Sequence, residues 1–237
     1  MTFTLTVRDE FVQTLVLTLI RDLTFEQEGD GYRATLTLRE ATSEGAGSTR
    51  ALAGVAPFRD VPMVFHLDST GAILRIDSVD TLWTRFCNGI ADQATGDDAQ
   101  RQLARVALET LRAAPPAQRT AMFIDLLKPA LAPHEAAQGV IANQPVSTAA
   151  DSPLGGSATL SGRRRAWREG DLLAMATHVE GDAPVPGAGD EKASAHIIID
   201  THAHVDPATG LLRDRRERTI RTTAEGTRIR TVETILR

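Results

Sequence analysis

Alternation of apolar with polar residues, at a period of two, is the feature that most constrains the fold of this chain. It runs through two separate parts of the sequence, residues 14–38 and residues 159–236, and it is rich in Leu, Val, Ile and Thr. Successive side chains of a strand point to opposite faces of a sheet, so this period is typical of strands with one buried face. The second part predicts five strands, at Thr159–Trp167, Leu172–Val179, Ala195–Val205, Leu211–Thr222 and Thr227–Leu236.

Short turns with Asp at the start and Gly at the end join strands into antiparallel hairpins. Asp68 to Gly71 separates the strand Val61–Leu67 from Ala72–Ile76, and Asp206 to Gly210 separates the third and fourth strands of the later part. Asp favours the first position of such turns, and Gly accepts the left-handed conformation that closes them. Residues 43–50 are polar and rich in Gly, which indicates a loop.

The middle of the chain shows helical rather than strand periodicity. A helix is expected from about Val79 to Ile90, with Leu82, Trp83 and Phe86 on one face, and another from about Ala117 to Lys128, with Phe123 and Leu127 on one side. A further helix begins near Asp97 and ends before Pro115. Residues 142–158 read as an irregular linker.

This order of strands, helices and strands predicts the α+β class, because helices and strands are segregated rather than alternating. We expect a curved, mostly antiparallel, half-barrel-like sheet with a central helical insert over one face. The chain is interpreted as a single domain over residues 1–237. Its parts are a β-rich half at 1–78, the helical insert at 79–141, the linker at 142–158 and a second β-rich half at 159–237.

Composition excludes several classes of protein. The 237 residues carry 31 acidic against 26 basic side chains, and this net charge of -5 argues against a nucleic-acid partner, because polyanion binding needs excess cations. Cys87 is the single cysteine, so neither an intrachain disulfide nor a thiolate metal cluster is expected, and Cys87 is interpreted as a core residue.

Nucleotide-binding and acyl-hydrolase motifs are absent, so no cofactor is expected. No apolar run approaches the length of a membrane-spanning helix.

The most prominent chemical motif is Asp200-Thr201-His202-Ala203-His204. It resembles the Asp-x-His-x-His signature of metal-dependent amidohydrolases and TatD-like nucleases, in which two histidines bind a divalent ion. Those families continue into a (β/α)8 barrel with further ligands, whereas no histidine follows His204 here. Alternation explains the motif more simply, as the wet face of a half-buried strand. A metal-dependent hydrolase using His202 and His204 stays as an alternative function.

Arginines cluster in the second β-rich half, most densely over the group Arg213, Arg215, Arg216, Arg218 and Arg221. Recognition of RNA by a sheet needs aromatic residues among the cations, and this stretch has none. Arginines also serve as solvated strand residues that discourage aggregation. An anionic surface or partner, such as lipid head groups, stays open as a second interpretation.

Two passages resemble known proteins. The hairpin Phe65–Ile73 and the following Asp77–Trp83 are similar to uncharacterised proteobacterial envelope proteins, in which such a hairpin leads into a helix with a Trp. The turn Val205–Leu212 resembles the Asp-x-x-Thr-Gly-Leu hairpin of LolA/LolB-like lipoprotein carriers. The resemblance implies an exported protein with a curved sheet over helices that holds an acyl chain between them, and it implies no catalytic residue.

The leading hypothesis is therefore a non-enzymatic bacterial envelope or periplasmic protein, although no signal peptide is visible in the chain. It would bind a hydrophobic or lipid-like ligand, or a lipidated partner, between sheet and helices. A structural or protein-interaction module is the alternative. Eight residues are expected to line the ligand or to form the core, which the sequence does not separate: Leu15, Leu17, Leu19, Phe65, Trp83, Phe86, Phe123 and Leu127.

Overall fold

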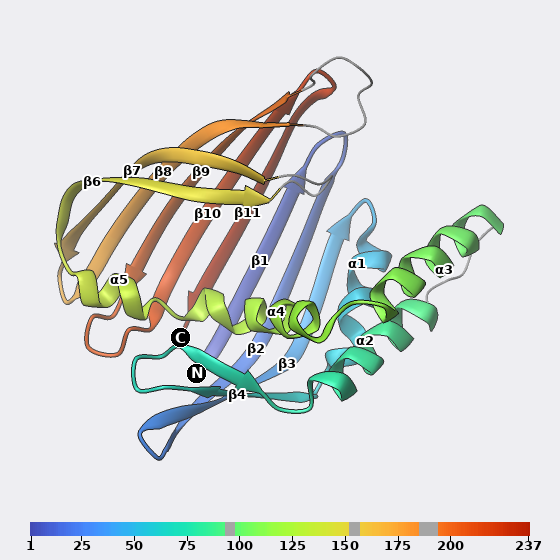
Figure 1. Ribbon diagram of the computed structural model, residues 1–237, viewed down its shortest axis with the longest axis horizontal. Coiled ribbons are helices and arrows are strands. Elements are labelled where there is room, and N and C mark those ends of the chain that lie inside the picture. Colours follow the sequence, from blue (N-terminus) through green and yellow to red (C-terminus); the bar gives the residue numbers. More distant parts are fainter. Residues whose placement is uncertain (93–97, 152–156, 185–193) are drawn as a thin grey trace. The chain divides into compact units, whose positions relative to one another are not determined.

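The protein forms an open, mostly antiparallel sheet with a set of helices, as a computed structural model shows (Figure 1). The structure describes residues 1–92, 98–151, 157–184 and 194–237. Strands lie in the order β5-β4-β3-β2-β1-β11-β10-β9-β8-β7-β6, so β5 and β6 are edges and the sheet is not closed. These strands are β1 (Thr2–Glu10), β2 (Thr14–Glu28), β3 (Gly31–Gly45), β4 (Pro62–Leu67), β5 (Ile73–Ile76), β6 (Ile141–Asp151), β7 (Ser157–Glu169), β8 (Leu172–Pro184), β9 (Ser194–Val205), β10 (Leu212–Thr223) and β11 (Gly226–Leu236). The helices are α1 (Ser48–Val55), η1 (Ala56–Phe58), α2 (Val79–Asp92), α3 (Asp98–Arg112), α4 (Pro116–Leu127), η2 (Lys128–Ala130) and α5 (Pro133–Gln138).

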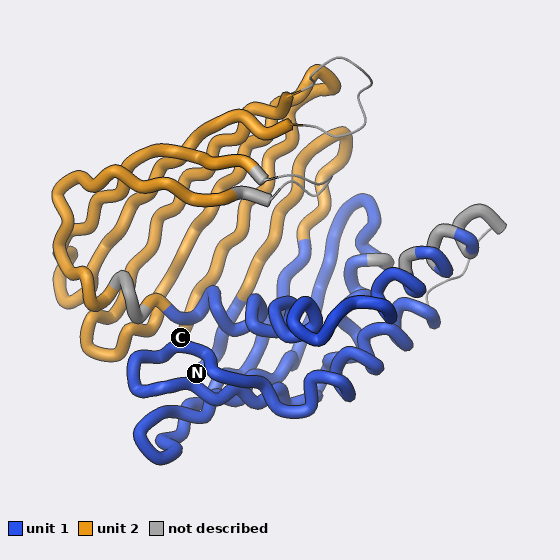
Figure 2. Tube along the Cα trace, viewed as in Figure 1, with its two compact units in different colours: residues 1–4, 17–131, 237 blue, residues 5–16, 132–236 orange. Residues whose placement is uncertain are grey.

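Contacts divide the chain into two compact units (Figure 2). Unit 1 comprises residues 1–4, 17–131 and 237, and unit 2 comprises residues 5–16 and 132–236. Unit 1 holds most of β2, the strands β3 to β5 and the helices α1 to α4, whereas unit 2 holds β6 to β11 and α5.

The predicted hairpins are confirmed, and their turn chemistry is visible in the hydrogen bonds. The Asp68 carboxylate accepts hydrogen bonds from the backbone N–H groups of Thr70 at 2.8 Å and of Ala72 at 2.9 Å. Gly71 closes the turn at a φ of 83°, in the left-handed region that glycine tolerates best. Asp206 and Gly210 repeat this chemistry between β9 and β10.

In unit 1, one face of the sheet carries the buried apolar side chains and the other carries polar ones. Leu19 and Leu23 of β2, Leu36 of β3 and Phe65 of β4 are almost fully buried on the first face. Helices pack on this part of the chain: α1 and η1 contact β3, and α4 contacts β5 and α2. The helices α2, α3 and α4 lie within two residues of their expected positions, and Cys87 is buried in α2 as expected.

In unit 2, the five strands predicted from alternation are confirmed as β7 to β11. One apolar cluster lies on β7, β8 and β9, where Leu160, Val179 and Ile197 are buried with Ala158 and Ala183. A second cluster joins Val205 of β9 and Leu212 of β10 to Ala132, just before α5. On β7, β8 and β9, the buried apolar side chains are therefore mainly those on the face that the period of two predicts.

Two loop predictions are wrong. The expected linker 142–158 is largely occupied by β6, which pairs with β7 from Ile141 to Asp151, while residues 152–156 lie outside the described residues. Its polar composition suits an edge strand, and Pro145 is tolerated because the outer side of an edge strand donates to no neighbour. In place of the loop at 43–50, β3 runs to Gly45 and α1 begins at Ser48, after a turn at Gly47 with a φ of 78°.

His66 of β4 is a buried polar residue on the polar face of unit 1. Its Nδ1 lies 2.5 Å from Glu28 Oε2 and its Nε2 lies 3.1 Å from Asp77 Oδ2. Only the imidazolium form donates from both nitrogens, so the hydrogen bond to Asp77 first, and then that to Glu28, raises the pKa of His66. Arg75 Nη2 is 3.2 Å from the same Nδ1 and opposes protonation, but the two carboxylates outweigh it.

The raised pKa of His66 makes the free energy of unfolding depend on pH. Its contribution is complete below the unfolded value of about 6.5 and is lost as the pH rises through the higher folded pKa. We expect His66→Gln to destabilise the protein more at about pH 6 than at about pH 9, as measured by urea unfolding at both values. The exposed His202 provides the control, and His202→Gln should show a smaller difference. An effect of His66→Gln that is the same at both pH values would contradict this assignment.

Candidate functional site

Seven of the eight residues expected from the sequence lie in unit 1, where Leu17 and Phe86 are partly buried and the other five are buried. Leu17 and Leu19 lie on β2, Phe65 lies on β4, Trp83 and Phe86 lie on α2, and Phe123 and Leu127 lie on α4. Leu15 also lies on β2 but belongs to unit 2. Phe65, Phe123 and Leu127 are fully buried.

An aromatic cluster joins α2, α4 and η1. Trp83 packs against Phe86 with ring centroids 5.5 Å apart and meets Phe123 edge-on at 6.4 Å. Phe58 of η1 completes the cluster, at 6.1 Å from Phe86 and 5.9 Å from Phe123. Phe58 was not predicted from the sequence, because Phe58 follows the Gly-rich residues 43–50, which indicated a loop. The structure thus brings Trp83, Phe86 and Phe123 together.

Arg21 is the main residue of this core that the sequence analysis did not identify. It lies on β2 between Leu19 and Leu23, and only 4% of it is exposed. Its Nη1 donates one long hydrogen bond of 3.4 Å to the carbonyl oxygen of Leu126 in α4, and its guanidinium lies 5.6 Å from the Phe3 ring. Among the described residues, no carboxylate forms an ion pair with it. The period of two was the available signal, because it places residue 21 on the same face as residues 19 and 23.

Burial lowers the pKa of Arg21 to about 10, and no nearby acid opposes this effect. The group is still protonated at neutral pH, so unit 1 holds a positive charge in an apolar environment. Buried charges are normally paired, because the desolvation cost is otherwise several kcal/mol. An anionic group that reached Arg21 would supply the missing partner.

Trp83 carries a second unsatisfied donor. Its indole Nε1 is buried and has no hydrogen-bond partner within the described part of the chain. A buried donor without an acceptor costs about 1–3 kcal/mol. Trp83 and Arg21 both contact α4, through Phe123 and through the Leu126 carbonyl respectively. Around α4, the Arg21 guanidinium and the Trp83 indole N–H therefore have few hydrogen-bond acceptors among the described residues.

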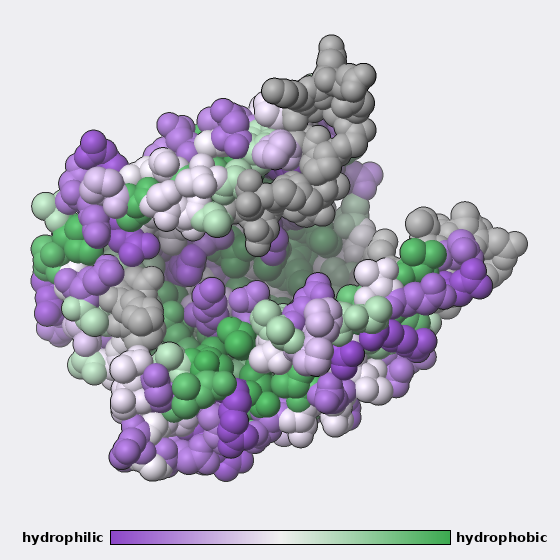
Figure 3. Space-filling model, viewed as in Figure 1, coloured by the Kyte–Doolittle hydropathy of each residue, from purple (hydrophilic) through white to green (hydrophobic). Residues whose placement is uncertain are grey.

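Apolar surface also gathers in this part of unit 1. In Figure 3 the green, apolar atoms are densest beside α4 and over the β4–β5 hairpin. Leu74 of β5 is 67% exposed, which is unusual for a large aliphatic side chain on an edge strand. Leu74 therefore adds an exposed aliphatic side chain to this apolar surface.

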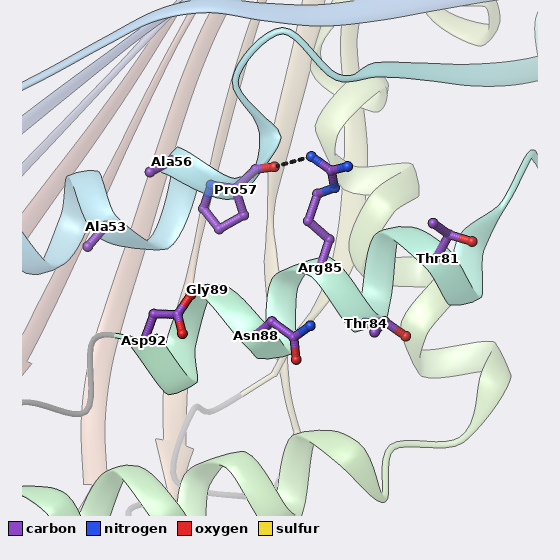
Figure 4. A pocket seen from close by; sticks show the side chains of 9 residues that line it. All are labelled: Ala53, Ala56, Pro57, Thr81, Thr84, Arg85, Asn88, Gly89 and Asp92. Carbon is purple, nitrogen blue, oxygen red and sulfur yellow. Dashed lines mark hydrogen bonds between the residues drawn. The ribbon is translucent and has the colours of Figure 1, made fainter.

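A pocket of about 810 Å³ lies between α1, η1 and α2 (Figure 4). Its lining is mainly apolar in surface, with Ala53 from α1 and Ala56 and Pro57 from η1, and the polar groups come from Thr81, Thr84, Asn88 and Asp92 of α2. Arg85 closes one side, where its Nη1 donates to the carbonyl oxygen of Pro57 at 3.4 Å. None of the eight residues expected from the sequence lines this pocket.

The histidine motif lies on the polar face of β9 in unit 2. His204 Nδ1 is 2.8 Å from the Asp214 carboxylate and its Nε2 is 3.5 Å from Glu169; the hydrogen bond to Asp214 is the main cause of a raised pKa of His204. His202 is exposed, with Ala176 and Arg216 opposite it on the neighbouring strands. Among the described residues, no group of three or more His, Cys, Asp or Glu side chains is arranged to hold a metal ion.

Comparison with known proteins supplies no family for this chain: no family model matches it, and no curated protein matches it. In the described residues, no helix is long and apolar enough to cross a membrane.

Gly89 tests the packing of α2 on η1. A methyl group at this position would lie 2.0 Å from Cγ of the rigid Pro57 ring. We expect Gly89→Ala to lower the free energy of unfolding by about 1–3 kcal/mol, because an overpacked contact must open. Gly54, in α1, has open space around the same methyl position, so Gly54→Ala should instead stabilise the protein by about 1 kcal/mol. Urea denaturation of both variants checks this, and equal stabilisation by both would show that α2 and η1 are not in close contact.

Proposed function

We propose that this protein binds a hydrophobic ligand with an anionic head group between the sheet and the helices of unit 1. The ligand is lipid-like, or it is the acyl chain of a lipidated partner, and the protein acts in the bacterial envelope without catalysing a reaction. The proposal takes from the resemblance to LolA/LolB-like carriers a half-barrel-like sheet with a helical insert over one face.

The observation that carries this proposal is the buried, unpaired Arg21. A charge kept in an apolar core costs stability, and replacing such a charge with an apolar side chain is often neutral or stabilising. A charge at this position is explained if Arg21 binds an anionic group of a ligand. A guanidinium offers five N–H donors in a fork that matches a carboxylate or phosphate, and Arg21 uses one of them for a long bond to Leu126.

The surrounding residues support a ligand with an apolar body. The expected residues Leu17, Leu19, Phe65, Trp83, Phe86, Phe123 and Leu127 provide aliphatic and aromatic surface on β2, β4, α2 and α4. Because they are now packed against one another, a ligand would enter by separating α4 from its neighbours. The apolar surface beside α4 is where such an entrance would lie.

Binding of laurate and of the uncharged detergent dodecyl maltoside tests this function. We expect laurate to raise the melting temperature of the wild type, because a ligand that binds only the folded state stabilises it. Arg21→Met should weaken laurate binding by about tenfold or more, as expected for loss of a charged hydrogen bond, and leave dodecyl maltoside binding nearly unchanged. The ligand-free variant should be at least as stable as the wild type.

Arg33→Met is the matched control, since Arg33 is an exposed arginine on the polar face of β3 in the same unit. It should bind laurate like the wild type. Native mass spectrometry of protein purified without detergent should also show an extra mass of a few hundred daltons that denaturation removes. Absence of both the added mass and the laurate effect would refute ligand binding and favour a structural or protein-interaction module.

A further inference from the structure

Three arginines lie together on one face of the β10–β11 hairpin in unit 2. Arg221 of β10 is directly opposite Arg228 of β11. Arg230 lies two residues further along β11, opposite Thr219, so it shares the face of Arg228 and is a diagonal neighbour of Arg221. Side chains at opposite and diagonal positions of an antiparallel pair are within reach of one another. The hairpin therefore concentrates three positive charges at one place.

On β7, β8 and β9 this face carries the buried apolar side chains of unit 2, whereas on β10 it carries Arg215, Glu217 and Thr219. Arg221 is opposite Ile197 of β9, which is buried in the cluster with Leu160 and Val179. Solvated arginines are expected on the other face of β10, where Arg216 and Arg218 lie exposed. Of the three arginines, Arg221 is partly buried beside this apolar cluster and its Nε is buried, whereas Arg228 and Arg230 are exposed. The cost of an unpaired charge therefore falls mainly on Arg221.

The charges in this cluster do not balance. Asp9 of β1 accepts hydrogen bonds from Arg228 Nε, at 2.8 Å, and from Arg228 Nη2. Arg228 and Arg230 together lower the pKa of Asp9, which places both near it. Arg221 receives no such partner: its Nε is buried and has no hydrogen-bond partner in the described part of the chain. Like charges directly opposite each other destabilise a sheet, so Arg221 and Arg228 repel each other.

We propose that Arg221, Arg228 and Arg230 bind a phosphate group carried by a small ligand or by a lipid head group. Among the described residues, the three guanidinium groups have one paired carboxylate, that of Asp9, so two positive charges have no ion-pair partner there, and they match a dianionic phosphate monoester. Its oxygens supply the acceptor that Arg221 Nε lacks, and its charge removes the repulsion between Arg221 and Arg228. The site lies wholly in unit 2 and does not depend on Arg21.

Calorimetric titration with inorganic phosphate and with dodecyl phosphate, at constant ionic strength set with chloride, tests the site. Arg221→Gln should weaken phosphate binding by about tenfold or more, since it removes a charged hydrogen bond. Arg218→Gln, on the opposite face of the same strand, should leave the affinity unchanged. The ligand-free Arg221→Gln protein should melt no lower than the wild type, because the substitution removes a repulsion, and this separates lost binding from lost folding.

The affinities of the two probes distinguish the sources of the phosphate. Tighter binding of dodecyl phosphate than of inorganic phosphate identifies a head group with an apolar chain, whereas equal affinities identify a free phosphate or a polar phosphate ester. Arg21→Met should bind inorganic phosphate like the wild type. The experiment therefore distinguishes failure of the phosphate site in unit 2 from failure of the proposed ligand site at Arg21 in unit 1. No phosphate binding by the wild type, or equal losses in Arg221→Gln and Arg218→Gln, would overturn the proposal.

Discussion

The strand order depends on the pairing of β1 with β11, which continues to the two ends of the chain. Thr2 N–H donates to the Arg237 carbonyl oxygen at 2.7 Å, and Arg237 N–H donates to the Thr2 carbonyl oxygen at 2.9 Å. Every other neighbouring pair in the sheet is made of strands consecutive in sequence. The topology is thus two sequential meanders, β1 to β5 and β6 to β11, that the pairing of β1 with β11 places in one sheet. The helices α2 to α5 follow β5, so β5 and β6 become the two edges.

This dependence separates what the sequence could predict from what it could not. Hairpins are local, and residues such as Asp68 and Gly71 determine their turns, so the strands of the later part were predicted to within a few residues. The pairing of β1 with β11 leaves no local signal, because only the fold brings Thr2 to Arg237. Strand β6 was missed for a different reason. Most of its described side chains are exposed, and it contains Pro145, which an edge strand tolerates, so it lacks the alternation that identifies the other strands.

The residues of the candidate site likewise include some that the sequence predicts and one that it does not. Trp83, Phe86 and Phe123 were predicted as lining or core residues because large apolar side chains at helical spacing form one face. Arg21 was not predicted, although it continues the period of Leu15, Leu17 and Leu19 on β2. Arginine side chains are normally exposed, and the sequence alone does not indicate which arginine is buried in a core. Such departures from a local rule are expected where a protein binds something.

The histidines on the polar face of unit 2 provide a comparison for the unpaired arginines Arg21 and Arg221. There, His178 is 2.7 Å from Asp200, His196 is 3.0 Å from Asp182 and His204 is 2.8 Å from Asp214, each pair joining neighbouring strands. These residues are exposed or partly exposed to water, where pairing gains little. Arg21 and Arg221 are less solvated, so a partner would gain more, yet neither has a carboxylate among the described residues. On the polar face of unit 2 these histidines have carboxylate partners, whereas the described residues offer Arg21 and the buried Nε of Arg221 none. This contrast is the observation on which both proposed anion sites rest.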